Sequence, residues 1–167
     1  TPKGLNSSIQ SKIEKLFNFS YKESPPLPPR IADLVDEFLL LFPLSELPTL
    51  TLERYTNIKS KNYFTYWLEH ETSMVGGVKG GSSFKLGIFR RRSKEQKLSN
   101  SRVNYTEEYE WYSRYGANED VAFKTILGNI VRTANFAAKG QISEIVNIPL
   151  DSRIKWKIAF LYQDFKK

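Results

Sequence analysis

The segment Gly76–Arg92 constrains the fold most, because it joins a glycine-rich turn to a short apolar alternation and then to a run of positive charge. Glycine permits positive φ angles and close backbone approach, and four glycines stand together here: Gly76, Gly77, Gly80 and Gly81. Phe84, Leu86 and Ile88 then alternate with polar or small residues. That period is typical of a half-buried strand, so we predict a strand over residues 83–88.

A block of cations follows this predicted strand. It contains Arg90, Arg91, Arg92, Lys94 and Lys97, and Glu95 is the only acidic residue among them. We interpret the block as a cationic edge that contacts nucleic acid. The alternative is an ordinary solvated strand end and loop, which is common in soluble proteins.

The glycines do not match a known nucleotide-binding motif. A P-loop needs a lysine directly before Ser or Thr at the start of a helix, whereas Gly81 precedes Ser82. A dinucleotide fingerprint lies between a strand and a helix, and these glycines precede a strand. We therefore predict no nucleotide cofactor.

Composition limits the function classes. The 167 residues are 40% hydrophobic and 14% aromatic, which suffices for one domain with a real core. The net charge of +7 favours a polyanionic partner such as nucleic acid, and less strongly an anionic membrane surface. The absence of cysteine excludes disulfides, zinc ribbons and thiol catalysis, and the single His70 cannot build a histidine-based metal site.

No apolar run reaches the length of a membrane span, and no secretory leader opens the chain. The expectation is a soluble, cytoplasmic protein without a membrane partner. Since the chain begins at Thr1 and stops just past an apolar segment, we expect a single domain, residues 1–167, excised from a longer protein.

The first half of the chain is predicted to be mainly helical. Residues 7–17 fit an amphipathic helix, and the Pro-rich residues 21–29 fit a stiff extended spacer. A second helix runs from Arg30 until Pro43 stops it, and residues 44–58 are interpreted as a loop. Asn62 is the predicted cap of a third helix.

The second half mixes strand and helix. Residues 93–103 are predicted to be a mobile polar loop, and residues 105–116 fit either a strand or a helix. Asn118 opens the clearest helix, which Lys139 and Gly140 close. Val121 is expected on its apolar face. A brief helix or turn and a last helix capped by Asp151 or Ser152 follow, so we predict an α+β fold with four or five helices packed around a small, mainly antiparallel sheet.

The aromatic segment 105–116 is the second candidate for recognition. Its rings could stack on a splayed or flipped base, and we assign base contact to Tyr109, Trp111, Tyr112 and Tyr115. The alternative is that most of these rings belong to the core, and it applies most strongly to Trp111. Arg114 stands beside two of the tyrosines.

No catalytic constellation is evident. The carboxylates at 107, 108, 110, 119 and 120 lack the strand-borne Asp, Glu and Lys spacing of magnesium-dependent nucleases. Ser82 and Ser83 have only His70 as a candidate base, on a different predicted element. We expect this domain not to be an enzyme and to need neither metal nor cofactor.

Several segments together resemble the amino-terminal domain that precedes the AAA+ motor in a group of McrB-like restriction proteins. The similar pieces are Leu52–Ile58, Tyr66–Glu69, Gly80–Ile88, Tyr112–Gly116 and Lys155–Gln163, which keep a consistent order over the last two thirds of the chain. The resemblance implies a substrate-targeting module that binds DNA, including a modified base. A separate motor would hydrolyse GTP or ATP and recruit an McrC-like nuclease.

Our functional hypothesis is a DNA-binding specificity domain of an McrBC-like restriction system. The predicted phosphate contacts are Lys79, Lys85, Arg90, Arg91, Arg92, Lys94, Lys97, Arg102 and Arg114. Two alternatives stay open. One is a protein-interaction module that docks a AAA+ motor or another partner through the apolar last helix, and the other is an RNA-binding module.

Overall fold

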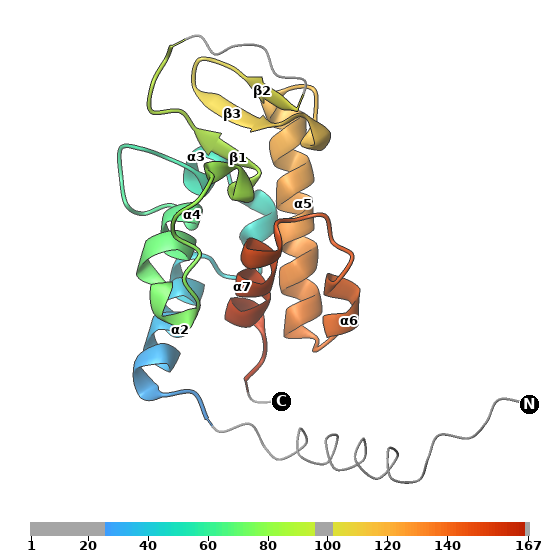
Figure 1. The fold of residues 1–167 in the computed structure, drawn as a ribbon. Coiled ribbons are helices and arrows are strands. Elements are labelled where there is room, and N and C mark those ends of the chain that lie inside the picture. The colour runs from blue at the N-terminus through green and yellow to red at the C-terminus, as the bar shows by residue number, and fades with distance from the viewer. Residues whose placement is uncertain (1–25, 96–101, 166–167) are drawn as a thin grey trace, which may run out of the picture.

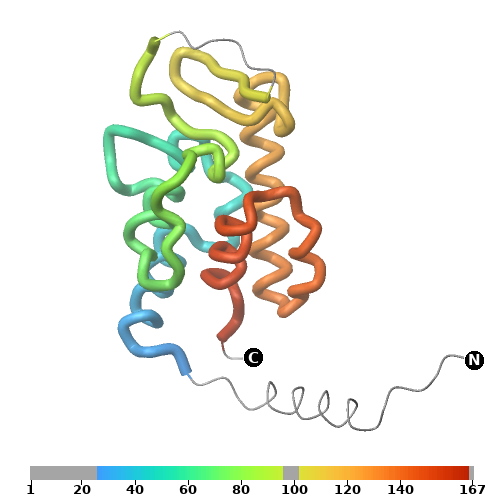
Figure 2. Tube along the Cα trace, viewed as in Figure 1, coloured from blue at the N-terminus to red at the C-terminus, as the bar shows by residue number. Residues whose placement is uncertain are grey.

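The computed structural model describes residues 26–95 and 102–165. Within these residues six α-helices pack around a three-stranded antiparallel sheet, which confirms the predicted α+β class (Figure 1). The predicted helix over residues 7–17 and most of the Pro-rich spacer lie outside the described part. Figure 2 shows that both ends of the described chain lie away from the sheet. No helix in residues 26–95 or 102–165 has the length and hydropathy to cross a bilayer.

Helix α5, Glu119–Ala138, is the longest element and begins and ends as predicted. The Asn118 side chain accepts a hydrogen bond from the Val121 amide at 3.0 Å, and Gly140 takes a positive φ of 71° after the helix. Helix α7, Ser152–Tyr162, lies along α5, and the Asp151 carboxylate caps it by accepting from the Arg153 amide.

The other helices are short except for α2, which runs over Pro29–Leu41 and confirms the predicted second helix. The remaining α-helices are α3, Leu52–Tyr55; α4, Phe64–Tyr66; and α6, Ile142–Ile145. Single turns are η1, Leu47–Thr49; η2, Trp67–Glu71; η3, Ser73–Val75; η4, Ser83–Leu86; and η5, Ser113–Tyr115.

Two expectations for residues 44–66 were wrong. The predicted loop contains η1 and α3, because Thr51 Oγ1 accepts from the Arg54 amide at 3.2 Å and so starts a helix locally. The third helix starts after Tyr63 and has no side-chain cap, so Asn62 does not cap it.

The sheet has the order β1-β3-β2, with β1 at Ile88–Arg90, β2 at Val103–Tyr105 and β3 at Tyr109–Tyr112. The aromatic segment 105–116 therefore contains the end of β2, the turn that follows it, β3 and the turn η5. Ile88 is opposite Trp111, and both are buried on the face that packs on α5. Alternate residues place Phe89, Glu110 and Tyr112 on the other face, which we call the outer face.

The predicted strand over 83–88 was wrong for its first half, since residues 83–86 form η4. Ser82 Oγ accepts from the Phe84 amide at 3.2 Å and starts this turn. Gly87 then takes a φ of 81° before β1 begins, so the extended backbone cannot pass through it. As a result both Lys85 and Leu86 are buried, against the predicted alternation.

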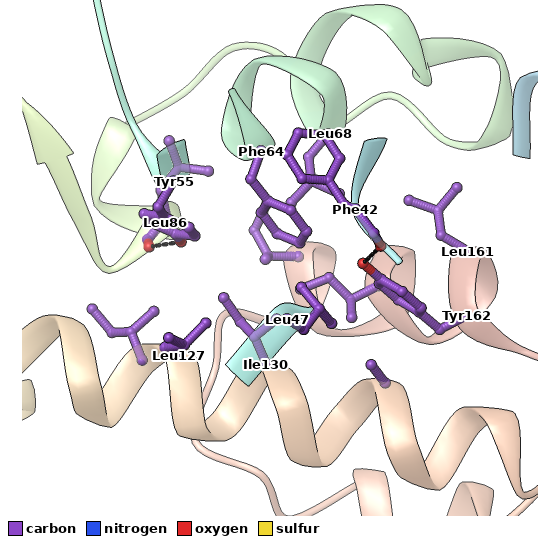
Figure 3. Packing of buried hydrophobic residues seen from close by; sticks show 14 of the residues in the cluster. Phe42, Leu47, Tyr55, Phe64, Leu68, Leu86, Leu127, Ile130, Leu161 and Tyr162 are labelled. Carbon is purple, nitrogen blue, oxygen red and sulfur yellow. Dashed lines mark hydrogen bonds between the residues drawn. The ribbon is translucent and has the colours of Figure 1, made fainter. Parts of the chain in front are cut away.

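The core lies between α2, α4, α5 and α7 (Figure 3). Two buried tyrosines tie it to the backbone: Tyr55 donates to the Leu86 carbonyl at 2.5 Å, and Tyr162 donates to the Phe42 carbonyl at 2.7 Å. Burial raises the pKa of both hydroxyls, so they remain protonated donors.

Candidate nucleic-acid interface

A cavity of about 290 Å³ opens beside β1, and we call it the basic pocket. Its walls combine three arginines with one aromatic ring, one carboxylate and two hydroxyls: Ser83, Phe89, Arg90, Arg91, Arg92, Ser93 and Glu110. The volume is at the lower end of the range for small-ligand pockets, about 300 Å³. Such a lining suits a planar ligand that carries both an amino group and a negative charge.

Arg91 is a structural residue and not a surface cation. Its side chain is buried, its Nη1 donates to the Thr106 carbonyl at 2.6 Å, and its Nη2 donates to the Glu95 carbonyl. The guanidinium also lies 4.9 Å from the Tyr105 ring centre. These contacts tie the chain after β1 to the turn between β2 and β3, so Arg91 cannot serve as the phosphate contact predicted from the sequence.

Lys85 is also withdrawn from the surface. Its ammonium lies 2.6 Å from Glu69 Oε1 and donates to the Gly80 carbonyl at 2.8 Å. The side chain is 2% exposed. The predicted phosphate contact at Lys85 is therefore wrong, because the ammonium satisfies its hydrogen bonds inside the protein.

Two further cations of the predicted set have acidic partners. Arg90 Nη2 donates to Glu108 Oε1 at 2.9 Å, and its guanidinium lies 5.6 Å from the Tyr109 ring centre. Lys94 lies 3.4 Å from Glu107, and both of these side chains are exposed. An exposed pair contributes only about 0–1 kcal/mol, so Lys94 can exchange Glu107 for a phosphate, whereas Arg90 is held by two contacts.

The exposed members of the predicted set are Lys79, Arg92, Arg102 and Arg114, together with Lys94. Within the described part of the chain, Lys79 and Arg92 have no hydrogen-bond or ion-pair partner. The Arg114 guanidinium lies 5.0 Å from the centre of the Tyr112 ring and 4.8 Å from that of Tyr115. Lys97 lies outside the described residues.

Three of the four predicted base-contacting rings belong to the core. Tyr109, Trp111 and Tyr115 are at most 5% exposed. Trp111 Nε1 donates to the Gly116 carbonyl at 2.9 Å, and burial raises the pKa of Tyr109. Only Tyr112 is half-buried, and it lies on the outer face. The predicted base contacts at Tyr109, Trp111 and Tyr115 are therefore wrong, because these three rings are buried.

Sequence reasoning missed two rings that join Tyr112. The Phe84 ring stacks on Tyr112 with centres 4.6 Å apart, and it meets Phe89 edge-on at 5.2 Å. We call Phe84, Phe89 and Tyr112 the outer aromatic cluster. It adjoins the basic pocket because Phe89 belongs to both. The signal for Phe89 was its place between Ile88 and Arg90 on a strand.

Glu110 is the second missed residue. It is 3% exposed, lines the basic pocket, and is opposite Phe89 and Tyr105 in the sheet register. A carboxylate in such a place accepts hydrogen bonds from amino groups such as cytosine N4. Its neighbouring carboxylates drew attention to Glu110 only as a metal ligand, and their spacing does not fit a magnesium site. Among the residues that the structure describes, no group of three or more acidic or histidine side chains could hold a metal.

The comparisons with protein-family models, with curated proteins and with solved structures each gave no match.

Proposed function

We propose that this domain is a DNA-binding specificity module of an McrBC-like restriction system, and that the basic pocket receives a nucleobase. The observation that carries the proposal is the pocket's lining, in which Phe89 offers a ring, Glu110 offers an acceptor and Arg92 offers an exposed cation. The net charge of +7 supports a polyanionic partner.

In this arrangement the contacts divide into two classes. Arg92, Lys94, Arg102 and Lys79 are exposed and supply salt-dependent contacts to phosphates, which fix orientation without reading sequence. The outer aromatic cluster and Glu110 contact a base, and a base in duplex DNA must leave its stack to enter the pocket. Specificity therefore resides in Glu110 and the rings, and overall affinity resides in the cations.

The test is binding of the purified domain to matched duplexes, with and without cytosine modification, at several salt concentrations. Arg92→Ala should weaken binding to every duplex by about fivefold to tenfold and lower the salt slope by about one. Tyr112→Ala should change the preference among duplexes more than it changes overall affinity.

The matched control for Arg92→Ala is Lys59→Ala, because Lys59 is an exposed cation that does not line the pocket. Equal losses for the two variants would show that binding depends only on total charge. A Tyr112→Ala variant that loses the same factor on every duplex would contradict base reading. Tighter binding to single-stranded RNA than to any duplex would instead favour the RNA-binding alternative.

A second candidate, protein docking, is favoured by the exposed rings of the last helix and its end. Trp156 is 40% exposed and Phe165 is 42% exposed, and Phe165 meets Phe160 with ring centres 5.2 Å apart. Large exposed rings are enriched at protein interfaces. This candidate predicts no nucleic-acid binding at moderate salt, so the same titrations distinguish it from DNA recognition.

A further inference from the structure

Two buried lysines fix the backbone of the glycine-rich segment 76–81, which we call the glycine loop. Lys157 Nζ donates to the Thr72 carbonyl at 2.8 Å and to the Gly76 carbonyl at 2.7 Å. Lys85 Nζ donates to the Gly80 carbonyl at 2.8 Å and pairs with Glu69. The lysines therefore hold the carbonyls of Gly76 and Gly80 toward the interior at both ends of the loop.

This anchoring sets the direction of two amides. A trans peptide unit is planar, and its N–H points opposite to its C=O. The described chain has no cis peptide bond, so the amides of Gly77 and Gly81 point away from the two buried ammoniums. Both glycines are exposed, and within the described part of the chain neither amide has a hydrogen-bond partner.

Two cations lie near these exposed amides. Lys79 lies between the two glycines, is exposed, and has no partner in the described residues. Arg153 Nη1 lies 3.5 Å from the place where a Cβ on Gly81 would be, although this guanidinium also pairs with Asp151. The carboxylate of Glu69, which is 21% exposed, is already paired with Lys85. Backbone amides presented beside cations form sites for tetrahedral oxyanions.

We propose that the glycine loop is a phosphate-binding site, in which the amides of Gly77 and Gly81 and the ammonium of Lys79 donate to the oxygens of a DNA phosphodiester. The loop leads through Ser82 to Ser83, which lines the basic pocket, so the proposed phosphate site is close to the pocket along the chain. This assignment rests on the proposed DNA recognition. The site is unlike a P-loop, because Lys85 points inward and no α-helix follows the glycines.

Position 77 allows a sharp test, since a Cβ there meets nothing within 4 Å and the position is not one of the positive-φ glycines. Gly77→Ala keeps the amide donor, whereas Gly77→Pro removes it. We expect Gly77→Pro to weaken duplex binding about tenfold relative to Gly77→Ala, which should bind like the parent. Lys79→Gln should weaken it by about fivefold and lower the salt slope by about one.

A second measurement on the unmodified protein covers the case in which Gly77→Pro fails to fold. Amide ¹H–¹⁵N spectra are recorded during titration with a short duplex and, separately, with inorganic phosphate. The proposal expects the Gly77 and Gly81 resonances to shift with both ligands. Duplex binding that leaves these two resonances unchanged would overturn the loop site and leave the proposed function standing.

The remaining outcomes separate the two proposals. Shifts with inorganic phosphate and no duplex binding would support the oxyanion site and overturn DNA recognition. Shifts with duplex and equal affinities of the Gly77→Pro and Gly77→Ala proteins would mean that the loop is near the DNA without donating to it, which overturns the site. Absence of shifts with either ligand would overturn it as well.

Discussion

Several cations of this protein are buried, so the net charge of the sequence overestimates the positive charge on its surface. Lys85, Arg91, Lys155 and Lys157 are each at most 7% exposed, and each donates to backbone carbonyls. A buried ammonium is tolerated only when acceptors replace its water. The carbonyls bonded by Lys157 are 81 and 85 residues away in the chain, so no local pattern could reveal its role.

Lys157 should make stability depend on pH. Burial lowers its pKa to about 8, against the attraction of Glu69, whereas an unfolded lysine titrates near 10.4. Between these values the unfolded chain binds more protons than the folded one, so this residue's contribution to stability grows as pH rises from 8. Burial raises the pKa values of Tyr55 and Tyr162, so these tyrosines lower the free energy of unfolding as pH rises. They do so only above about pH 10, where unfolded tyrosines lose their protons.

The measurement is the free energy of unfolding of the parent and of Lys157→Met at pH 7.5 and pH 9.5. The parent should gain about 2 kcal/mol relative to the variant over this interval. Glu69 and Lys85 face the same interior region and are present in both proteins. A constant difference between the two proteins would contradict the lowered pKa.

At the scale of elements, Gly87 decides where β1 begins. It takes a φ of 81°, and a Cβ there would lie 2.7 Å from Ile126 Cδ1 on α5. Gly87→Ala should therefore destabilise the protein by about 2–4 kcal/mol, since backbone strain and overpacking each cost about 1–3 kcal/mol. Chemical denaturation monitored by circular dichroism measures the loss.

The control is the same substitution in α5. Gly128 is exposed, and a Cβ there meets nothing within 4 Å, so Gly128→Ala should stabilise the helix by about 0.5–1 kcal/mol. A similar small effect at both glycines would mean that Gly87 neither blocks the strand nor sets the packing of β1 on Ile126.

Some elements could be predicted from strong local signals, whereas the short Thr51-capped helix α3 and the elements set by tertiary contacts could not. The ends of α5 follow from Asn118 and Gly140, which act within one turn. Val121 was placed on the apolar face but is 47% exposed, because it lies on the same side of α5 as the exposed residues Lys124, Thr125 and Gly128. The η4 turn starts at the local Ser82 cap, but Gly87 at its end packs against Ile126, and that contact spans 39 positions of the chain.

The candidate site divides in the same way. Arg92 and Tyr112 were predicted and are accessible, because both follow from a charge run and an aromatic run. Phe89 and Glu110 become neighbours only through the β1–β3 register, which the sequence does not specify. Arg91 and Lys85 are buried, so they are not available to a ligand as Arg92 is. The charge run in the sequence does not distinguish these two residues from Arg92.

At the scale of the whole molecule, the basic pocket and the exposed rings of α7 lie on different elements. A ligand that binds only the folded state raises the melting temperature by mass action. A short duplex should therefore raise the melting temperature of the parent by several degrees at about 50 mM salt, and this shift should shrink steeply toward about 200 mM salt, since phosphate contacts release counterions.

Variants of the basic pocket and of α7 test which of the two surfaces binds the duplex. Arg92→Ala should reduce the duplex-induced shift, whereas Trp156→Ala should leave it at the parent value, because Trp156 is exposed on α7 and does not line the pocket. Differential scanning fluorimetry with matched duplex and salt series measures both. If Trp156→Ala abolished the shift and Arg92→Ala preserved it, DNA would bind at α7, and the pocket beside β1 would lose its assigned role.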